Sequence, residues 1–549
     1  MTAAPVLDPD VVIVPAARVD WRRWAVPAAI AALAVVGLAL RVHLLTHQQL
    51  NGDVAVAGLM ADQIRHGHFY TFYWGNQYGG GGFYIDALSL ALFGRGPVVL
   101  NATAAAVAAL SAVLLWRAVL RVVPSERRWL AGLAAAVFWV WPEAALWNST
   151  SESGFRPLTM AAGIAAILLA MRTVENRSMT DAAATGVALG VGWWSSPEII
   201  YFMVVAIGII GLEVWRDRAA AWRRRLLLLA AGFGLGALPW VWTNLHTGLA
   251  SLRLSSSPGY APLTYTGRLS LFLHMVFPMM LGLRRPVSGA WVGGAVGQIL
   301  YILALAALAA ICVRGLARIR SAPLQAACCA GLVLFPFEYA AFPATSYWLD
   351  GHYGVFCLPL VILVVAGGLP GTLKRPALEL SAAGAAIAVV VLTVTAYNTQ
   401  FLGGRLSALF KGGPNPNRAA LTAITELQTN GIRQGYADYW VAYDLDFLSH
   451  ERLDVTDPSV DRWVALYRQV RRSPDPAWIF YAPTRVPEAV AEFGSPNQGP
   501  FAYQESEFLT GLAALNIGYR IVHAGVLDAV VTDRPVLQEQ VGMGPPVFR

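Results

Sequence analysis

The sequence predicts a polytopic α-helical membrane protein with a small C-terminal α/β domain outside the membrane. Of its 549 residues, 56% are hydrophobic and only 13% are charged, and the mean hydropathy is +0.52. A soluble domain carries about 25% charged residues. A membrane-spanning helix needs about 20 apolar residues, and such runs recur between charged clusters through roughly the first 400 residues. Beyond them the chain becomes more polar and alternates short helix-like and strand-like stretches.

The apolar runs predict about eleven transmembrane helices in a membrane domain over residues 1–398. Arg22 and Arg23 precede the first run, and cytoplasmic loops collect basic residues, so the N-terminus is expected in the cytoplasm. Arginine clusters then fall in every second loop, and an odd number of spans places the C-terminal domain outside. The expected spans are 24–45, 98–121, 129–147, 156–173, 182–195, 197–215, 224–244, 291–313, 322–343, 354–370 and 377–398.

One further apolar run, 269–283, is expected to be re-entrant or interfacial. It contains Pro278, and counting it as a span would place Arg314 and Arg318 on the outer side, against the charge bias of the other loops. The same bias accounts for the net charge of +7, so the charge does not indicate nucleic-acid binding. All four cysteines fall in apolar spans, so no disulfide framework is expected.

A glycine- and proline-rich stretch predicts a linker over residues 399–417, followed by an extracytoplasmic α/β domain over residues 418–549. Helices are expected over 418–430, 440–448 and 459–470. Strands are expected over 434–437, 452–455, 477–481, 519–523 and 526–531.

Asp53 is the first candidate for chemistry. It follows the first span at the start of a helix-like stretch, where a carboxylate could act as a base toward a hydroxyl. The alternative is an ordinary helix cap, since Asp is favoured at that position. A loop with the sequence Gln77-Tyr78-Gly79-Gly80 follows, and its glycines permit close approach of the backbone to a ligand or serve as a plain flexible turn.

These two segments together resemble the start of bacterial GT-C glycosyltransferases. Those integral-membrane enzymes are related to protein O-mannosyltransferases and lipid A aminoarabinose transferases, and the resemblance is to glycosyltransferase family 39-like members. It covers about 350 membrane residues by layout and loop pattern. The resemblance implies that Asp53 is the catalytic carboxylate and that Gln77 and Tyr78 contact substrate.

The same resemblance implies substrate-binding roles for four residues of other outer loops. Glu152 would position the acceptor, or else form a capping pair with Arg156. Arg284, Arg285 and His352 would hold the phosphate of a lipid-linked donor, because arginine binds phosphate bidentately; the alternative is binding of anionic lipid headgroups. In the outer domain, Tyr439 and Trp440 would stack on an acceptor sugar, or else belong to the domain core.

The activity implied is glycosyl transfer at the outer face of the bacterial cytoplasmic membrane. The donor would be a polyprenyl-phosphate-linked monosaccharide, and the acceptor a hydroxyl of an envelope glycan, glycolipid or protein, with inversion at the sugar. No cofactor is certain: relatives include enzymes with and without a divalent cation. His66-Gly67-His68 offers only two ligands, so no metal site is assigned.

Two other classes remain open on the sequence. A lipid-linked sugar flippase or transporter would show related halves and broken helices meeting at mid-membrane, and no clear internal repeat is present. A non-catalytic glycan-binding relative is hinted at by Val54 and Phe83, which stand where many relatives carry acidic residues.

Overall fold

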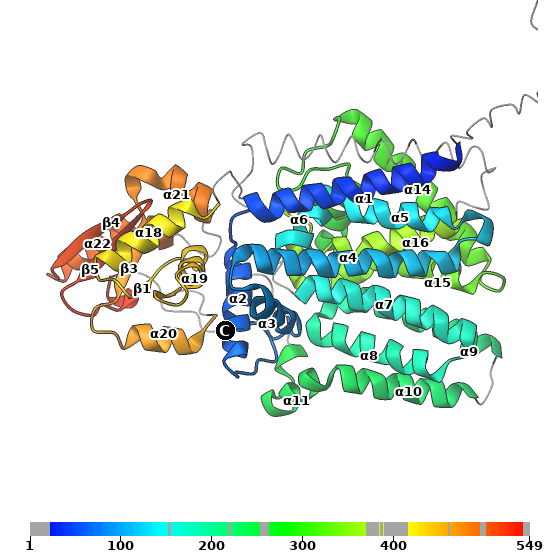
Figure 1. Ribbon diagram of the computed structural model, residues 1–549, viewed down its shortest axis with the longest axis horizontal. Coiled ribbons are helices and arrows are strands. Elements are labelled where there is room, and N and C mark those ends of the chain that lie inside the picture. Colours follow the sequence, from blue (N-terminus) through cyan, green and yellow to red (C-terminus); the bar gives the residue numbers. More distant parts are fainter. Residues whose placement is uncertain are drawn as a thin grey trace, which may run out of the picture.

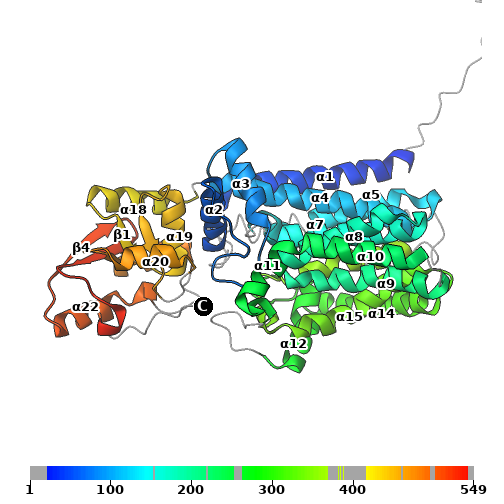
Figure 2. The ribbon, with the colours of Figure 1, turned by 90° about the horizontal axis from the view of Figure 1, so that it is seen from below.

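A bundle of long helices forms one part of the molecule, and a small α/β domain lies beyond one end of it (Figure 1). Helix α2 (Gly52–Arg65) lies between the two parts in both side views (Figure 2). The computed structural model describes residues 22–151, 155–217, 221–252, 263–368, 416–458, 462–494 and 501–541, with the single positions 381, 384 and 388.

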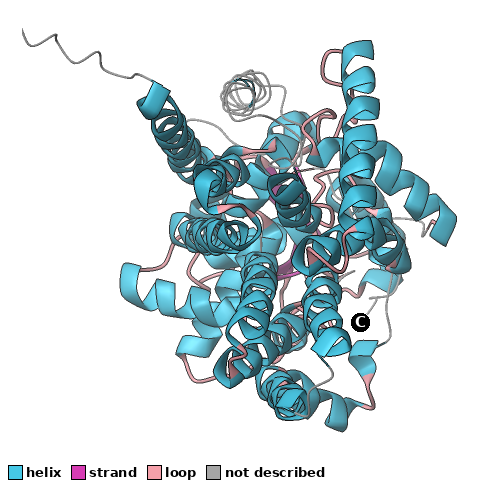
Figure 3. Cartoon of the chain, turned by 90° about the vertical axis from the view of Figure 1, so that its right-hand side faces the viewer, coloured by secondary structure: helices cyan, strands magenta, loops and turns pink. Residues whose placement is uncertain are grey.

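Roughly parallel helices build the bundle, and most of them appear end-on in Figure 3. Its buried centre is formed mainly by α7, α9, α15 and α16. The bundle helices are α1 (Arg22–His47), α4 (Pro97–Val122), α5 (Trp129–Val140), α6 (Glu143–Ser151), α7 (Phe155–Asn176), α8 (Met179–Ser195), α9 (Ile200–Asp217), α10 (Ala221–Gly236), α11 (Leu238–Thr247), α14 (Ala295–Ala317), α15 (Pro323–Ala341) and α16 (Leu358–Gly368).

The structure confirms a multi-pass membrane protein but not the count of eleven spans. Within the described ranges, six helices are long and apolar enough to cross a membrane, or eight if each of two bent pairs is one span. Helices α5 and α6 meet at 70° and α10 and α11 at 66°. Pro142 and Pro239 lie at these breaks, and proline cannot continue a helical hydrogen-bond ladder. The eleventh expected span, 377–398, lies outside the described residues apart from three positions.

The apolar run 269–283 folds as a short interrupted helix. It comprises α12 (Tyr265–Leu271), a π-helical turn over Phe272–Val276 and α13 (Phe277–Met280). It is not among the helices that meet the length and hydropathy of a span. This agrees with the expectation of an interfacial or re-entrant segment.

A five-stranded mixed sheet organises the C-terminal domain, with the order β2-β1-β3-β5-β4. Strand β1 pairs in parallel with β2 and β3, and β5 pairs antiparallel with β3 and β4. The strands are β1 (Gln434–Tyr436), β2 (Asp454–Thr456), β3 (Ala477–Tyr481), β4 (Tyr519–Ala524) and β5 (Leu527–Thr532). The helices are α18 (Arg418–Thr429), α19 (Tyr439–Leu448), α20 (Val464–Arg471), α21 (Val486–Phe493) and α22 (Glu505–Ala514). All five strands lie where the sequence predicts them, whereas α20 begins five residues later than expected.

Helix α19 of this domain packs directly on α2, and the two helices share one buried apolar cluster. Gly58 makes the close approach: a Cβ there would lie 2.4 Å from the ring of Phe447. An ionic clamp closes the far end of the contact, where Arg95 Nη1 lies 2.7 Å from Asp62 and 3.2 Å from Glu451. The membrane helices and the C-terminal domain are therefore joined by a packed and charged interface.

Candidate active site at the junction of bundle and C-terminal domain

Asp53 lies in the first turn of α2, but it is not the cap of that helix. The cap is Asn51, whose side-chain oxygen accepts from the Asp53 backbone N–H at 2.8 Å. The half-buried Asp53 carboxylate has a different partner, since its Oδ1 accepts from the Tyr439 hydroxyl at 2.5 Å. The structure thus removes the simple capping explanation for this carboxylate.

Two further groups surround the carboxylate. The hydroxyl of Tyr73 donates to the Asp53 backbone carbonyl at 2.9 Å. The guanidinium carbon of Arg462 lies 5.7 Å from the Tyr73 ring centroid and 5.5 Å from that of Tyr439. Burial acts against the charge of Arg462, but interactions with Tyr439, Tyr73 and Asp53 outweigh it and raise the Arg462 pKa above its ordinary value. A cation is therefore held beside the acid.

The Gln77–Gly80 turn packs against the C-terminal end of α8. The backbone N–H of Gly79 donates to the Ser195 carbonyl at 2.8 Å, and a Cβ on Gly80 would lie 2.1 Å from Trp194. The close approach that these glycines allow is thus made to the C-terminal end of α8. The turn directs Gln77 and Tyr78 into the lining of a cavity.

This cavity, of about 480 Å³, lies between the turn, the broken helix α10–α11 and the loop before α16. Much of its wall is aromatic, including a T-shaped pair of Trp193 and Trp240 with centroids 5.8 Å apart. Aromatic walls with a few polar groups are typical of small-molecule sites. The lining residues are Gly75, Asn76, Gln77, Tyr78, Trp193, Pro197, Glu198, Tyr201, Trp240, Ala250, Ser251, Leu252, Phe342, Pro343, Ala344, Thr345 and Tyr353.

Two buried polar atoms in this wall lack a partner among the described residues. They are Oε2 of Glu198 and the hydroxyl of Tyr201, on side chains 5% and 0% exposed. Buried polar groups are nearly always hydrogen-bonded, so an exception at a cavity wall indicates a place for a ligand or water. The other carboxylate oxygen of Glu198 lies 3.5 Å from Arg156 Nε.

Tyr78 links the cavity to the Asp53 centre, which is formed by Asp53, Tyr73, Tyr439 and Arg462. Burial raises the pKa of the Tyr78 hydroxyl, and Arg156, Glu198, Arg462 and Asp53 all act on it electrostatically. Asn76, which also lines the cavity, accepts a hydrogen bond from Arg462 Nη1 at 2.7 Å. The cavity therefore adjoins the residues around Asp53.

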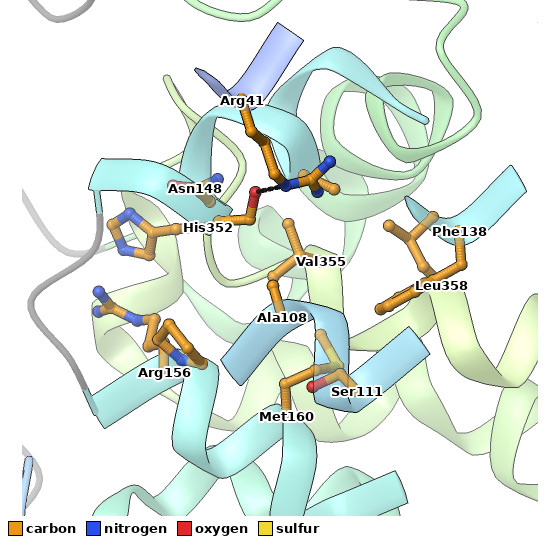
Figure 4. A pocket seen from close by; sticks show the side chains of 13 residues that line it. Arg41, Ala108, Ser111, Phe138, Asn148, Arg156, Met160, His352, Val355 and Leu358 are labelled. Atoms are coloured by element: carbon orange, nitrogen blue, oxygen red, sulfur yellow. Dashed lines mark hydrogen bonds between the residues drawn. The ribbon is translucent and has the colours of Figure 1, made fainter. Parts of the chain in front are cut away.

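A second, smaller pocket of about 60 Å³ lies inside the bundle next to Arg156 (Figure 4). Its two ends differ: His352 and Arg156 lie at one, and Phe138 and Leu358 at the other. Arg41 of α1 also borders it, and donates to Ser149 Oγ at 3.1 Å and to the Trp139 carbonyl at 2.6 Å. The pocket thus has cationic groups at one end and apolar walls at the other.

The side chain of His352 is held at this pocket by Asp350. Its Nδ1 lies 2.8 Å from the Asp350 carboxylate, and its buried Nε2 has no partner in the described part of the chain. Burial acts to raise the pKa of Asp350. The opposite effect of His352 and Arg156 is larger, so the pKa of Asp350 lies below its usual value. Asp350 therefore fixes the orientation of the imidazole, and Nε2 is left available for a ligand.

The remaining predicted residues are spread more widely. Arg284 packs its guanidinium 4.1 Å from the Trp291 ring centroid and donates to the Gly289 carbonyl, within its own loop. Arg285 interacts electrostatically with Glu143. This loop contacts the one that carries His352, because the Val287 N–H donates to the Leu349 carbonyl at 2.6 Å. Glu152 lies outside the described residues.

In the outer domain, Tyr439 is fully buried against α2, while Trp440 packs partly buried beside the same cluster. Tyr439 therefore lies in a core, as one of the two sequence alternatives had it, but that core is the interface with α2.

Sequence reasoning did not assign Arg462, Tyr73, Glu198 or Arg41 to the site. Glu198 carried a signal, since an acid at the start of an apolar span defaults to a functional hypothesis. Arg462 carried none, because nothing local marks its contact with Tyr73. Among the described residues, no group of three or more His, Cys, Asp or Glu is placed to hold a metal ion.

The long helical bundle, the juxtamembrane helix with its carboxylate and the α/β domain beyond it define a GT-C-type fold. Among solved structures, the chain is similar to ArnT from Cupriavidus metallidurans in the apo state, with a TM-score of 0.58 at 12% identity over 95% of this chain and 100% of that one. It is likewise similar to the same protein bound to undecaprenyl phosphate, with a TM-score of 0.55 at 13% identity over 96% and 99% of the two chains.

A weaker likeness is to the archaeal oligosaccharyltransferase AglB from Archaeoglobus fulgidus, with a TM-score of 0.47 at 12% identity over 93% of this chain and 74% of that one. No protein-family model matches the chain, and no curated protein sequence matches it. The expected resemblance is thus confirmed at the level of the fold, and the activity has to be argued from the site.

Proposed function

We propose that the protein is a glycosyltransferase that moves a sugar from a polyprenyl-phosphate-linked monosaccharide to an acceptor hydroxyl, at the outer face of the cytoplasmic membrane. The observation that carries the proposal is the placement of a partnered carboxylate, Asp53, beside a cavity that adjoins an amphipathic pocket. Each feature corresponds to one part of the reaction: a base, a sugar site and a site for a lipid phosphate.

The pocket of Figure 4 suits the head of a polyprenyl phosphate. Arg156 and the free Nε2 of His352 would bind the phosphate, and the apolar end would take the first prenyl units. A solved structure of similar fold is bound to undecaprenyl phosphate. Arg284 and Arg285, in the adjoining loop, would assist by attracting the anionic donor rather than by holding it, because the Arg284 guanidinium already lies on Trp291.

The aromatic cavity suits the transferred sugar. Glu198 Oε2 and the Tyr201 hydroxyl would bind sugar hydroxyls, and the tryptophan faces would cover the ring. Gln77 and Tyr78 would close the side toward Asp53. The polar groups are few, so the cavity favours a monosaccharide over a long glycan.

The reaction then balances with the groups present. The acceptor oxygen attacks the anomeric carbon from the face opposite the phosphate, and the bond from that carbon to the phosphate oxygen breaks. Asp53 takes the acceptor proton, and polyprenyl phosphate leaves with its negative charge stabilised by Arg156 and His352. One displacement inverts the anomeric centre. No nucleotide is needed because the glycosyl phosphate is already activated.

A transfer assay tests the proposal. Purified protein in nanodiscs is given a panel of radiolabelled polyprenyl-phosphate monosaccharides with cell-envelope acceptor, and donor binding is measured separately. Label should move from one donor, and Asp53→Asn should lower the rate by about 10²–10⁴-fold with donor affinity kept. Asp475→Asn, a change at an exposed loop of the outer domain, is the matched control.

Equal transfer by Asp53→Asn would exclude Asp53 as the base. Donor binding without any transfer by the wild type would favour a flippase or a glycan-binding protein, and a liposome assay for lipid flipping separates those two.

A further inference from the structure

The carboxylate proposed as the base belongs to the membrane part of the chain, yet its hydrogen-bond donor belongs to the C-terminal domain. Tyr439 donates to Asp53 Oδ1 across 386 residues of sequence. Among the described residues, Asp53 Oδ2 has no partner. One oxygen is thus fixed by the outer domain, and the other is left for an incoming hydroxyl.

The Tyr439 hydroxyl has little freedom to move. Its ring is completely buried and makes edge contacts with Trp440 and Tyr443, at centroid distances of 5.0 and 5.3 Å. The close contact of Gly58 with Phe447, described above, fixes α19 on α2 two turns further along. Packed interiors respond to changes of a single methylene, so this interface holds the donor in place.

Arg462 extends the same arrangement from a second segment of the outer domain. Its Nη1 donates to Asn76 Oδ1 at 2.7 Å, next to the Gln77–Gly80 turn, and its backbone N–H donates to the Tyr443 hydroxyl at 2.9 Å. The adjacent Trp463 stacks on Trp74 with centroids 4.5 Å apart. The buried Nε of Arg462 has no partner among the described residues. A cation is therefore anchored between the turn and the Asp53 centre.

We propose that the C-terminal domain completes the catalytic centre, with Tyr439 and Arg462 acting as positioning residues for Asp53. Tyr439 fixes the direction of the carboxylate, and Arg462 holds the Gln77–Gly80 turn in place and brings a positive charge near the carboxylate. This inference rests on the proposed function, in which Asp53 is the base. It gives the outer domain a part in the reaction itself, besides any part in recognising the acceptor.

The first test is Tyr439→Phe, which removes the hydroxyl and keeps the ring. We expect kcat to fall by about tenfold or more, with donor KM within about twofold of wild type. Tyr436→Phe is the matched control: it makes the same change at a buried tyrosine of the same domain, in a separate apolar cluster.

Arg462→Lys and Arg462→Gln form a second pair. Lysine keeps the charge and glutamine does not, so transfer should be slower in Arg462→Gln than in Arg462→Lys. Hydrogen–deuterium exchange adds a readout that does not need transfer. Exchange in the first two turns of α2 should rise in Tyr439→Phe and Arg462→Gln and stay at the wild-type level in Tyr436→Phe.

An unchanged kcat in Tyr439→Phe would overturn the inference. So would a fall in kcat of the same size in Tyr436→Phe, because that pattern marks a general loss of fold. If the wild type transfers no sugar at all, the proposed function fails, and the exchange experiment still decides whether the outer domain positions Asp53.

Discussion

The Asp53 centre and the aromatic cavity lie next to each other but differ in how far their polar groups are hydrogen-bonded. Around Asp53, the hydroxyls of Tyr439 and Tyr73 both donate to Asp53, and Arg462 Nη1 donates to Asn76, so that hydrogen bonds join two domains. In the cavity wall, Glu198 Oε2 and the Tyr201 hydroxyl are buried without partners among the described residues. Paired groups fix a geometry, whereas unpaired groups beside open space are free for a ligand. The contrast distinguishes the Asp53 centre, whose geometry must be rigid, from the cavity wall, which must bind a ligand.

The largest effect is expected where the two regions join, at the buried pair of Glu198 and Arg156. Glu198→Gln removes the carboxylate from that guanidinium, and breaking a buried pair costs about 3 kcal/mol or more. Thermal unfolding in detergent measures the loss. Glu175→Gln, at the half-exposed pair with Arg121, is the control and should cost no more than about 1 kcal/mol. Equal losses would mean that the Glu198 pair is solvated and not part of a closed site.

The interface behind Asp53 gives the next effect. Gly58→Ala places a methyl group against the Phe447 ring, and overpacking of this kind costs about 1–3 kcal/mol. Transfer should fall together with stability. Gly211→Ala in α9 is the control, because nothing lies within 4 Å of its Cβ. If Gly58→Ala is as stable and as active as Gly211→Ala, rigid docking of α19 is not needed.

A pair of tyrosines tests the contrast directly. The Tyr339 hydroxyl donates to the Thr345 carbonyl at 2.9 Å, so Tyr339→Phe should cost about 1 kcal/mol and leave sugar binding unchanged. The Tyr201 hydroxyl has no such partner, so Tyr201→Phe should be nearly neutral for stability. It should instead raise donor KM by about tenfold. The reverse pattern would show that Tyr201 is structural.

The smallest effect concerns Asp446 of α19, which lines neither of the two pockets. Its buried Oδ2 has no partner among the described residues. Burial raises the pKa of Asp446, assisted by Asp454 and Glu451 and opposed by the Val455 N–H and Arg95. The folded protein therefore binds this proton more tightly than the unfolded chain, so the contribution to stability falls as pH rises from about 4 through the raised pKa.

Asp446→Asn removes that penalty. Its gain in melting temperature over wild type should grow between pH 5 and pH 8, with transfer unchanged. A constant difference across this range would show that Asp446 does not titrate there.

Much of this architecture follows from local sequence signals. Short strand-like stretches between helix-like ones place all five strands of the C-terminal domain. A carboxylate after the first apolar run marks Asp53. The breaks at Pro142 and Pro239 were also signalled by the prolines, although the expected spans ran through them. Such features depend on neighbours in sequence, which is why they can be predicted.

The rest depends on contacts between distant segments. Nothing near Arg462 indicates that it anchors at Asn76, and nothing near Tyr439 indicates that its hydroxyl reaches Asp53. The charge of a side chain is visible in the sequence, but its partner is set by the fold. Of the Asp53 centre, the sequence therefore predicted the acid but not the contacts that hold it.

The separation of Asp53 from Tyr439 also has a consequence for biosynthesis. A chain grows by about 5–20 residues per second, so roughly 20 to 80 seconds pass between the synthesis of the acid and that of its donor. During that interval the membrane helices can insert while the carboxylate has no hydroxyl beside it. The centre closes only after the C-terminal domain has been synthesised and folded. Ribosome stalling or premature termination before that point therefore leaves an inserted chain with an unfinished centre.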